Sequence, residues 1–334
     1  MKFAVGIFGN QPLPQIIKRV KLAEDLGYDC AWFADLQRIC RELYVEMTAC
    51  ALSTSRIKLG AGVTMPVTRH ASVTASAFAT LNEIAQGRLR AGISIGDNGL
   101  RSVGYNPVPI AELEHYVGQV RGLLQNQTVQ FEGGVEGKLA WLESPTDIPI
   151  YIAATGPKLT RAAGRMGDGA ILLRGLTHLQ MQDGVDAFRQ EAEKAGKRPD
   201  QVKVSCWVQA SLGPDRALAR NMVKGPVAVI LSMAHLSTFD DDDHPAVRKI
   251  KESYDPSRHS RSYVGDKLQI PDKFIDMFAL GGDKYDARER VKELSKVQGL
   301  DEIILAPQHV PELPGPSVEE TIRYFAEEVM AHVS

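Results

Sequence analysis

Apolar residues along the chain follow two alternating patterns, short continuous runs and longer segments with helical spacing. The run "FAVGIFG" at residues 3–9 predicts a strand. In the segment that follows, Ile16 and Val20 lie near helical spacing and Gly27 stands at its end, which is typical of a helix with a glycine C-cap. The chain therefore opens with a strand followed by a helix.

This pairing of a strand with a helix recurs along the chain. In the further predicted pairs, each strand is given first and its helix second: 30–35 with 41–54, 57–65 with 72–87, 89–96 with 111–126, 148–154 with 158–167, 169–175 with 179–196, 202–212 with a helical region from about 215, and 302–308 with 317–333. Strands that alternate with helices predict a parallel sheet, and continuous apolar runs suit strands covered on both faces. Eight such pairs favour one α/β domain over residues 1–334, a closed (β/α)8 TIM barrel. The alternative is an open, doubly wound sheet, but "GNQPLPQ" after the first strand lacks the G-x-G-x-x-G turn expected there.

Two stretches interrupt the repeat. Residues 128–143 predict a short hairpin before the fifth strand. Residues 238–272 are polar and predicted to be poor in helix, and we interpret them as an insertion after the seventh strand, over the active-site face. The acidic run from Asp240 to Asp243 is followed by His244, but consecutive acids point in different directions, so a solvated loop is favoured and no metal site is predicted.

Composition narrows the class of protein. The chain has 334 residues and a net charge of −2, which gives no broad basic face for nucleic acid. Its four cysteines (Cys30, Cys40, Cys50 and Cys206) form no C-x-x-C pair, which predicts free thiols in a reducing, cytoplasmic location. We expect no leader segment and no membrane span, because no apolar run approaches about 18 residues.

In a barrel of this kind, the residues that carry function lie at the carboxyl ends of the strands. The candidate residues selected by that rule are Asp35, Gly62, Val63, Thr64, Gly96, Asp97, Asn98, Ala154, Thr155, Gly156, Pro157 and Lys158. Each also has a structural interpretation: Asp35 as a turn residue, "GDNG" as a tight turn, and "TGPK" as the start of a helix. Their convergence on one barrel mouth favours function.

Two of these strand ends indicate how a ligand is held. Gly60 and Gly62 alternate within one strand, which suits the close approach of a flat ring; a bulge that only shapes the barrel is the alternative. Thr155, Gly156 and Lys158 would suit a phosphate, because a helix N-terminus offers unpaired N–H groups to an anion.

Several motifs together resemble the luciferase-like flavin-dependent oxidoreductases. They are "GAGVTMPVTRHASVTASA", "GRLRAGISIGDNGLRSVG", "IYIAATGPKLTRAAGRMGDGAIL" and "GLDEIILAP". The resemblance covers nearly the whole chain, weakens over about 220–285, and is strongest to the branch that uses coenzyme F420, including the methylenetetrahydromethanopterin reductases.

The resemblance implies roles for the strand-end residues. A non-prolyl cis peptide between Gly62 and Val63 would form a bulge behind the middle ring of the cofactor, and Thr64 would contact the ring system. Residues 96–98 would lie beside its reactive face, and residues 154–158 would line its side chain and phosphate.

One departure affects the mechanism that the resemblance implies. Members of the family often carry Asp-His where this chain has Asp35-Leu36. Asp35 or Asp97 then remains as the candidate catalytic acid or base, while His70 is expected to shape its loop.

The leading hypothesis for function is therefore an F420-dependent oxidoreductase that transfers hydride between the deazaflavin and a small organic substrate. The alternatives are an FMN-dependent monooxygenase and a flavin-binding protein without catalysis. The apolar segment "RELYVEMTACALST" could serve the interface of a homodimer.

Overall fold

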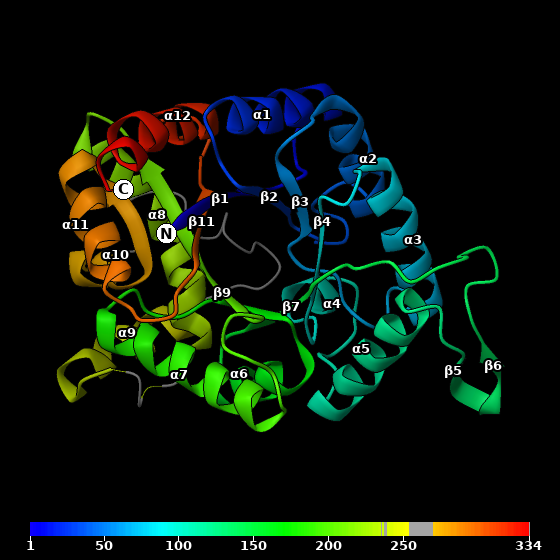
Figure 1. Cartoon of the computed structure of the whole chain (residues 1–334). Coiled ribbons are helices and arrows are strands. Elements are labelled where there is room, and N and C mark those ends of the chain that lie inside the picture. The colour runs from blue at the N-terminus through cyan, green and yellow to red at the C-terminus, as the bar shows by residue number, and fades with distance from the viewer. Residues whose placement is uncertain (235, 237–238, 254–269, 334) are drawn as a thin grey trace. The chain divides into compact units, whose positions relative to one another are not determined.

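The computed structural model describes residues 1–234, 236, 239–253 and 270–333, with the side chains of Asn98 and Met233 outside this description. The strands are β1 (Lys2–Ile7), β2 (Cys30–Phe33), β3 (Lys58–Ala61), β4 (Leu89–Ile93), β5 (Val129–Gln130), β6 (Glu136–Gly137), β7 (Ile150–Ala154), β8 (Gly169–Leu172), β9 (Lys203–Leu212), β10 (Ala279–Gly282) and β11 (Glu302–Pro307) (Figure 1). The helices are α1 (Leu13–Asp25), α2 (Leu43–Ser53), α3 (Ala71–Ile84), α4 (Asn98–Arg101), α5 (Ile110–Leu124), α6 (Pro157–Met166), α7 (His178–Lys194), α8 (Arg216–Met233), α9 (His244–Ser253), α10 (Asp272–Phe278), α11 (Lys284–Ser295) and α12 (Val318–Glu328).

Eight parallel strands close into a barrel. Their order is β9, β11, β1, β2, β3, β4, β7, β8, and β8 pairs back with β9. Backbone hydrogen bonds from Lys2 N to Asp301 O (2.9 Å) and from Asp301 N to Val204 O (2.8 Å) join β1, β11 and β9. Every residue of β2, β4, β8 and β11 is buried, as expected for strands covered on both faces. The predicted (β/α)8 TIM barrel is confirmed.

The chain divides into two compact units. The first comprises Met1–Leu173, Gln182–Trp207 and Gln298–Ile304, and contains β1 to β8 with the first parts of β9 and β11. The second comprises Arg174–Met181, Val208–Val297 and Leu305–Ser334. The assignment of residues 1–334 to a single domain stays a prediction. In the first unit, β5 and β6 pair antiparallel, which confirms the predicted hairpin at 128–143.

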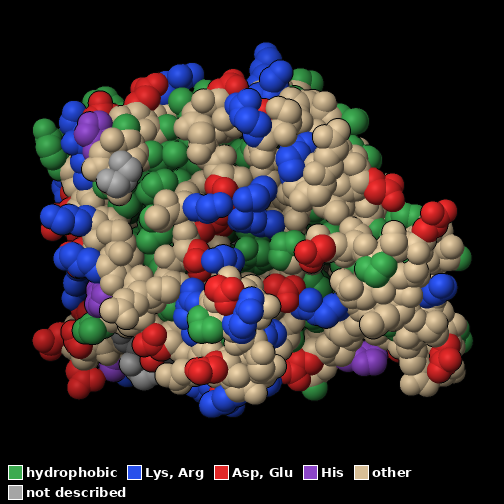
Figure 2. Space-filling view, in the orientation of Figure 1, with side chains coloured by type: hydrophobic (Ala, Val, Ile, Leu, Met, Phe, Trp, Pro, Cys, Tyr) green, Lys and Arg blue, Asp and Glu red, His purple; other side chains and the backbone are tan. Residues whose placement is uncertain are grey.

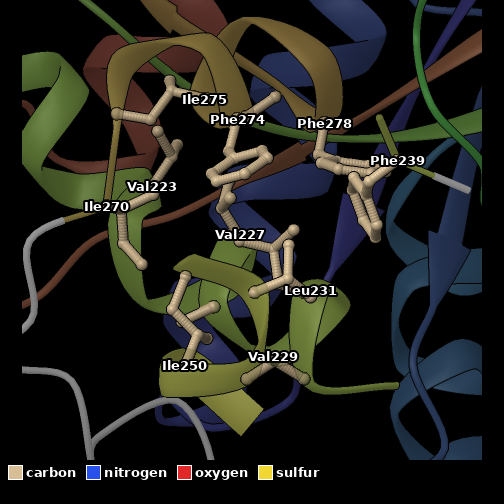
Figure 3. Close-up of a cluster of buried hydrophobic side chains, with 13 residues drawn as sticks. Val223, Val227, Val229, Leu231, Phe239, Ile250, Ile270, Phe274, Ile275 and Phe278 are labelled. Carbon is tan, nitrogen blue, oxygen red and sulfur yellow. The ribbon is translucent and has the colours of Figure 1, made fainter. Parts of the chain in front are cut away.

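The second unit has its own apolar core (Figure 3). Phe239 and Phe274 meet edge to face with ring centroids 5.8 Å apart, and both belong to a buried cluster that includes Val227 of α8. The expectation that residues 238–272 are poor in helix is wrong for 244–253, which form α9. The physical reason is that Val247 and Ile250, three positions apart, lie on one face of a helix and are buried in this cluster. Residues 254–269 of the predicted insertion lie outside the described part of the chain.

The sequence pattern also failed to predict β10. Its residues, Ala279–Gly282, pair with Gln209–Leu212 in the second part of β9. The strand is short and ends in two glycines, which have low strand propensity, so only pairing with β9 defines it.

Candidate active site

The chain forms a bulge at the barrel mouth directly after β3. The peptide bond between Gly62 and Val63 is cis, as the family resemblance implies. The chain then rejoins the sheet at Thr64, whose N–H donates to Gly92 O at 3.0 Å. A Cβ on Gly92 would lie 2.0 Å from Ala61 O, so only glycine at this point of β4 leaves room for the bulge. Sequence reasoning did not single out Gly92.

The glycines of β3 and the bulge contact tryptophan rings of the protein itself. A Cβ on Gly60 would lie 2.2 Å from Trp32 Cε3, and one on Gly62 would lie 3.1 Å from Trp32 Cβ and 3.4 Å from Trp207 Cζ3. A flat ring does pack against Gly60, but it is the fully buried indole of Trp32. The interpretation of Gly60 as a contact of the bound cofactor ring is therefore corrected.

The interior of the barrel ends at the mouth in an apolar floor. Val63, Ala153 and Trp207 are partly buried and pack on a buried cluster that includes Trp32. Phe8 meets Trp207 edge to face, with ring centroids 6.2 Å apart. Such a floor, partly open and flanked by polar groups, suits a flat aromatic ring.

A buried ion pair stands beside this floor. Asp35, at the end of β2, is 5% exposed and forms an ion pair with the guanidinium of Arg69. Arg69 also donates to Glu42 Oε1 at 2.8 Å and to Thr64 Oγ1 at 3.3 Å. Gln37 Nε2 donates to Asp35 Oδ1 at 3.0 Å. The network joins the loops after β2 and β3, and so holds Thr64 next to the bulge.

The protonation of Asp35 reflects two opposing influences. Burial raises the pKa of this carboxyl above its ordinary value, whereas the charge and hydrogen bonds of Arg69 oppose the rise. A carboxyl in this position can orient Arg69 or exchange a proton. Its catalytic role stays a prediction.

Two tyrosines contact Arg69. The guanidinium carbon lies 4.9 Å from the ring centroid of Tyr44, within cation–π range. Tyr116 donates from its hydroxyl to Arg69 O at 3.1 Å and lies 2.6 Å from Thr74 Oγ1. The sequence pattern did not single out Arg69, Tyr44 or Tyr116. Arg69 lies within the family motif "GAGVTMPVTRHASVTASA", which could have indicated it. The two tyrosines, on α2 and α5, lie outside the family motifs. As expected, His70 shapes its loop, because its side chain accepts from Ser72 N at the start of α3.

The end of β4 provides the second candidate acid. Asp97 is about half exposed, and its Oδ1 accepts from Arg101 Nε at 2.5 Å. Gly96 has a φ of +76°, a conformation that favours glycine. Asn98 begins α4, and its side chain lies outside the described part. The structure thus pairs Asp97 with an exposed arginine, and its predicted role at the reactive face is still a prediction.

The end of β7 leads directly into α6. Ala154 is buried, whereas Thr155 and Lys158 are exposed. Gly156 is the N-cap residue of α6 with no side-chain cap hydrogen bond, and Pro157 is the first residue of the helix. The first N–H groups of α6 thus have no side-chain cap and could receive an anion, and the phosphate contact there stays a prediction.

Basic and acidic side chains are interspersed over the face in Figure 2, in keeping with the small net charge. Within residues 1–253 and 270–333, as far as they are described, no three His, Cys, Asp or Glu side chains converge as a metal ion would require. Over the same residues, no helix is both long and apolar enough to cross a bilayer.

Comparison with known proteins identifies relatives over the full length. Residues 1–301 match the family described as luciferase-like monooxygenase. The chain is 30% identical to the 5,10-methylenetetrahydromethanopterin reductase of Archaeoglobus fulgidus, and the match covers 99% of each protein. It is 34% identical to the F420-dependent glucose-6-phosphate dehydrogenase of Nakamurella multipartita over 66% of this chain and 70% of the relative.

A solved structure agrees with the fold. The coenzyme F420-dependent tetrahydromethanopterin reductase of Methanopyrus kandleri superposes with a TM-score of 0.82, and the match covers 100% of this chain and 99% of the other, at 24% identity.

Proposed function

This chain belongs to the luciferase-like monooxygenase family, and from that premise we propose that it is an F420-dependent oxidoreductase that transfers hydride to or from an organic substrate. The observation that carries the proposal is the partly buried apolar floor of Val63, Ala153 and Trp207, in a chain similar over 99% of its length to a methylenetetrahydromethanopterin reductase. The compound to test first is 5,10-methylenetetrahydromethanopterin.

The residues present fit a deazaflavin. Val63, Ala153 and Trp207 offer the partly buried apolar surface that a flat ring requires. The uncapped start of α6 and the charge of Lys158 suit the phosphate-bearing side chain. When bound, the cofactor supplies hydride chemistry, which requires donor and acceptor carbons held roughly 3–3.5 Å apart with water excluded.

The residues at the mouth bind and orient the ring. The Asp35–Arg69 pair presents a fixed dipole at the mouth, and Thr64 stands between that pair and the bulge. Thr64 is fully buried, and its N–H bond to Gly92 anchors the bulge to β4. These contacts support a rigid rim for the ring.

An FMN-dependent monooxygenase is the second candidate, because the family's description names a monooxygenase. A flavin-binding protein without catalysis is the third.

A titration separates these candidates. We expect the apoprotein to bind F420 with micromolar or lower Kd, to bind FMN much more weakly, and to transfer hydride from reduced F420 without oxygen. Fluorescence quenching measures binding, and anaerobic absorbance measures transfer. Tight FMN binding with oxygen consumption and no response to F420 would favour the monooxygenase, and binding without turnover would favour the third candidate.

The start of α6 provides a second prediction. Replacing Lys158 by Ala should weaken binding of F420 more than binding of its core that lacks the phosphate-bearing chain, because an exposed cation at a helix N-terminus acts on the anion alone. Titration of both ligands against both proteins measures the difference. Equal weakening of the two would contradict a phosphate contact, and Lys194→Ala on α7 is a matched control.

A homodimer is also part of this proposal. Val45, Leu52 and Val73 are more than half exposed on α2 and α3, which supports an apolar interface between copies. A monomeric mass by light scattering would argue against it.

A further inference from the structure

Glu46 is a buried carboxyl group on α2 to which the proposed function gives no role. It is 1% exposed, and neither of its carboxyl oxygens has a hydrogen-bond partner within the described residues. Most buried polar groups in proteins are paired, because desolvation without a partner is unfavourable. The position of this acid therefore requires an explanation.

The carboxyl of Glu46 fills the space of a missing side chain at Gly9. A Cβ on Gly9 would lie 2.3 Å from Glu46 Oε2 and 3.0 Å from Glu46 Cδ. Gly9 lies two residues past the end of β1, and Arg41 fixes it by donating from its backbone N–H and from Nη1 to Gly9 O, both at 3.0 Å. Helix α2 thus delivers an acid to the barrel mouth at the end of β1, where barrel enzymes place their chemistry.

The surroundings of Glu46 favour its neutral form. The charged and titratable groups that act on it are Arg41, Asp35, Glu42, Cys40 and Cys50. Burial raises the pKa of Glu46 to about 8; Asp35 and Glu42 add to the rise, and Arg41 opposes it. Asp35 differs because Arg69 compensates its charge. The mouth thus holds one ion-paired carboxyl and one that carries a proton at neutral pH, a division typical of acid–base sites.

We propose that Glu46 is the proton donor of this active site, an inference that rests on the proposed hydride transfer. The substrate class is a neutral compound with a C=N or C=O bond. Its carbon forms a C–H bond with the hydride, while the O–H bond of Glu46 breaks and its proton passes to the substrate nitrogen or oxygen. The substrate gains two electrons, which the reduced cofactor loses. The carboxylate left at Glu46 is favoured by the charge of Arg41 and regains a proton from water.

The first test measures the protonation of Glu46 in the absence of any cofactor. Burial raises the pKa of Glu46 from its ordinary value of about 4.5 to about 8 in the folded protein, so the native state binds more protons than the unfolded state between about pH 4.5 and 8, and stability falls as the pH rises through that window. Glu46→Gln removes this loss. We therefore expect the Tm of Glu46→Gln relative to wild type to increase from pH 5 to pH 8. Glu83→Gln, on exposed Glu83 of α3, should give a constant difference.

The second test measures the delivery of a proton from Glu46 to the substrate. Glu46→Gln should lower kcat for reduction of the substrate by about 10²–10⁴-fold with little change in the Kd of F420, and Glu46→Asp should recover part of the loss. Gly9→Ala should push the carboxyl aside and lower kcat in the same direction. Glu83→Gln again serves as the control.

The two tests separate this inference from the proposed function. A pH-independent Tm difference for Glu46→Gln, or a kcat within twofold of wild type in a protein that reduces substrate with F420, would overturn the role of Glu46. Absence of any F420 activity in wild type, with the Tm signature present, would instead overturn the proposed function and leave Glu46 a buried neutral acid without this substrate.

Discussion

Replacing Glu302 by Ala should destabilise the protein by about 3–5 kcal/mol, because it leaves buried donors on Arg90, Trp32 and Ser205 without their acceptor, while Arg90 keeps its 2.8 Å contact to Asp29. Glu302 is 3% exposed at the start of β11, and its Oε1 accepts from Arg90 Nη1 at 2.8 Å. Its Oε2 accepts from Trp32 Nε1 at 3.1 Å and from Ser205 Oγ at 2.9 Å. One carboxylate therefore joins β2, β4 and β9 inside the barrel.

Denaturant unfolding followed by circular dichroism measures this effect. Glu302→Gln keeps the shape and an acceptor oxygen, so we expect it to cost clearly less than the alanine variant. The double variant Glu302→Leu with Arg90→Met should cost less than the sum of the two single changes, because it removes both charges together. A loss below about 1 kcal/mol in Glu302→Ala would show that the cluster contributes little.

Replacing Arg69 by Met should have the largest effect on the site itself. The change leaves Asp35 buried without its cation and removes the contact to Thr64, and we expect a loss of about 3–5 kcal/mol. Binding of F420 should weaken at least tenfold, because Thr64 adjoins the bulge.

The stability loss in Arg69→Met should depend on pH. The pKa of Asp35 in the folded protein lies above its ordinary value of 3.8. Between 3.8 and that raised pKa, the native state binds more protons than the unfolded state, so stability falls as the pH rises through this window. Without Arg69 this window extends to higher pH. The difference in unfolding free energy between variant and wild type should therefore be larger at about pH 8 than at about pH 5.

Glu42→Gln is the matched control for Arg69→Met. It removes the other, half-exposed partner of Arg69 but keeps an oxygen for Val45 N at the start of α2. We expect a change of about 0–1 kcal/mol with no pH trend. An equal loss in both variants, or a loss in Arg69→Met that does not vary with pH, would contradict the role given to Asp35.

The order of strands and helices was readable from the sequence for a physical reason. Strands buried on both faces have to be continuous apolar runs, and the helices that cover them have to be amphipathic, so eight alternations predicted the barrel. The apolar pattern did not predict elements that bury few apolar residues. Segment 244–253 has only Val247 and Ile250 as buried apolar residues, and its helix depends on the second unit's core.

For the candidate site too, the sequence determined some features and the tertiary structure determined others. The sequence by itself determined that Asp35, Thr64 and Gly96 stand at strand ends, because a barrel directs those ends to one face. Only the tertiary structure decided what each one meets. It brought Arg69 onto Asp35 from 34 positions away, and it placed Trp32 rather than a ligand against Gly60. It also set Glu46 into the space left by Gly9, because the contact of a side chain with a residue distant in sequence depends on packing, which local periodicity does not encode.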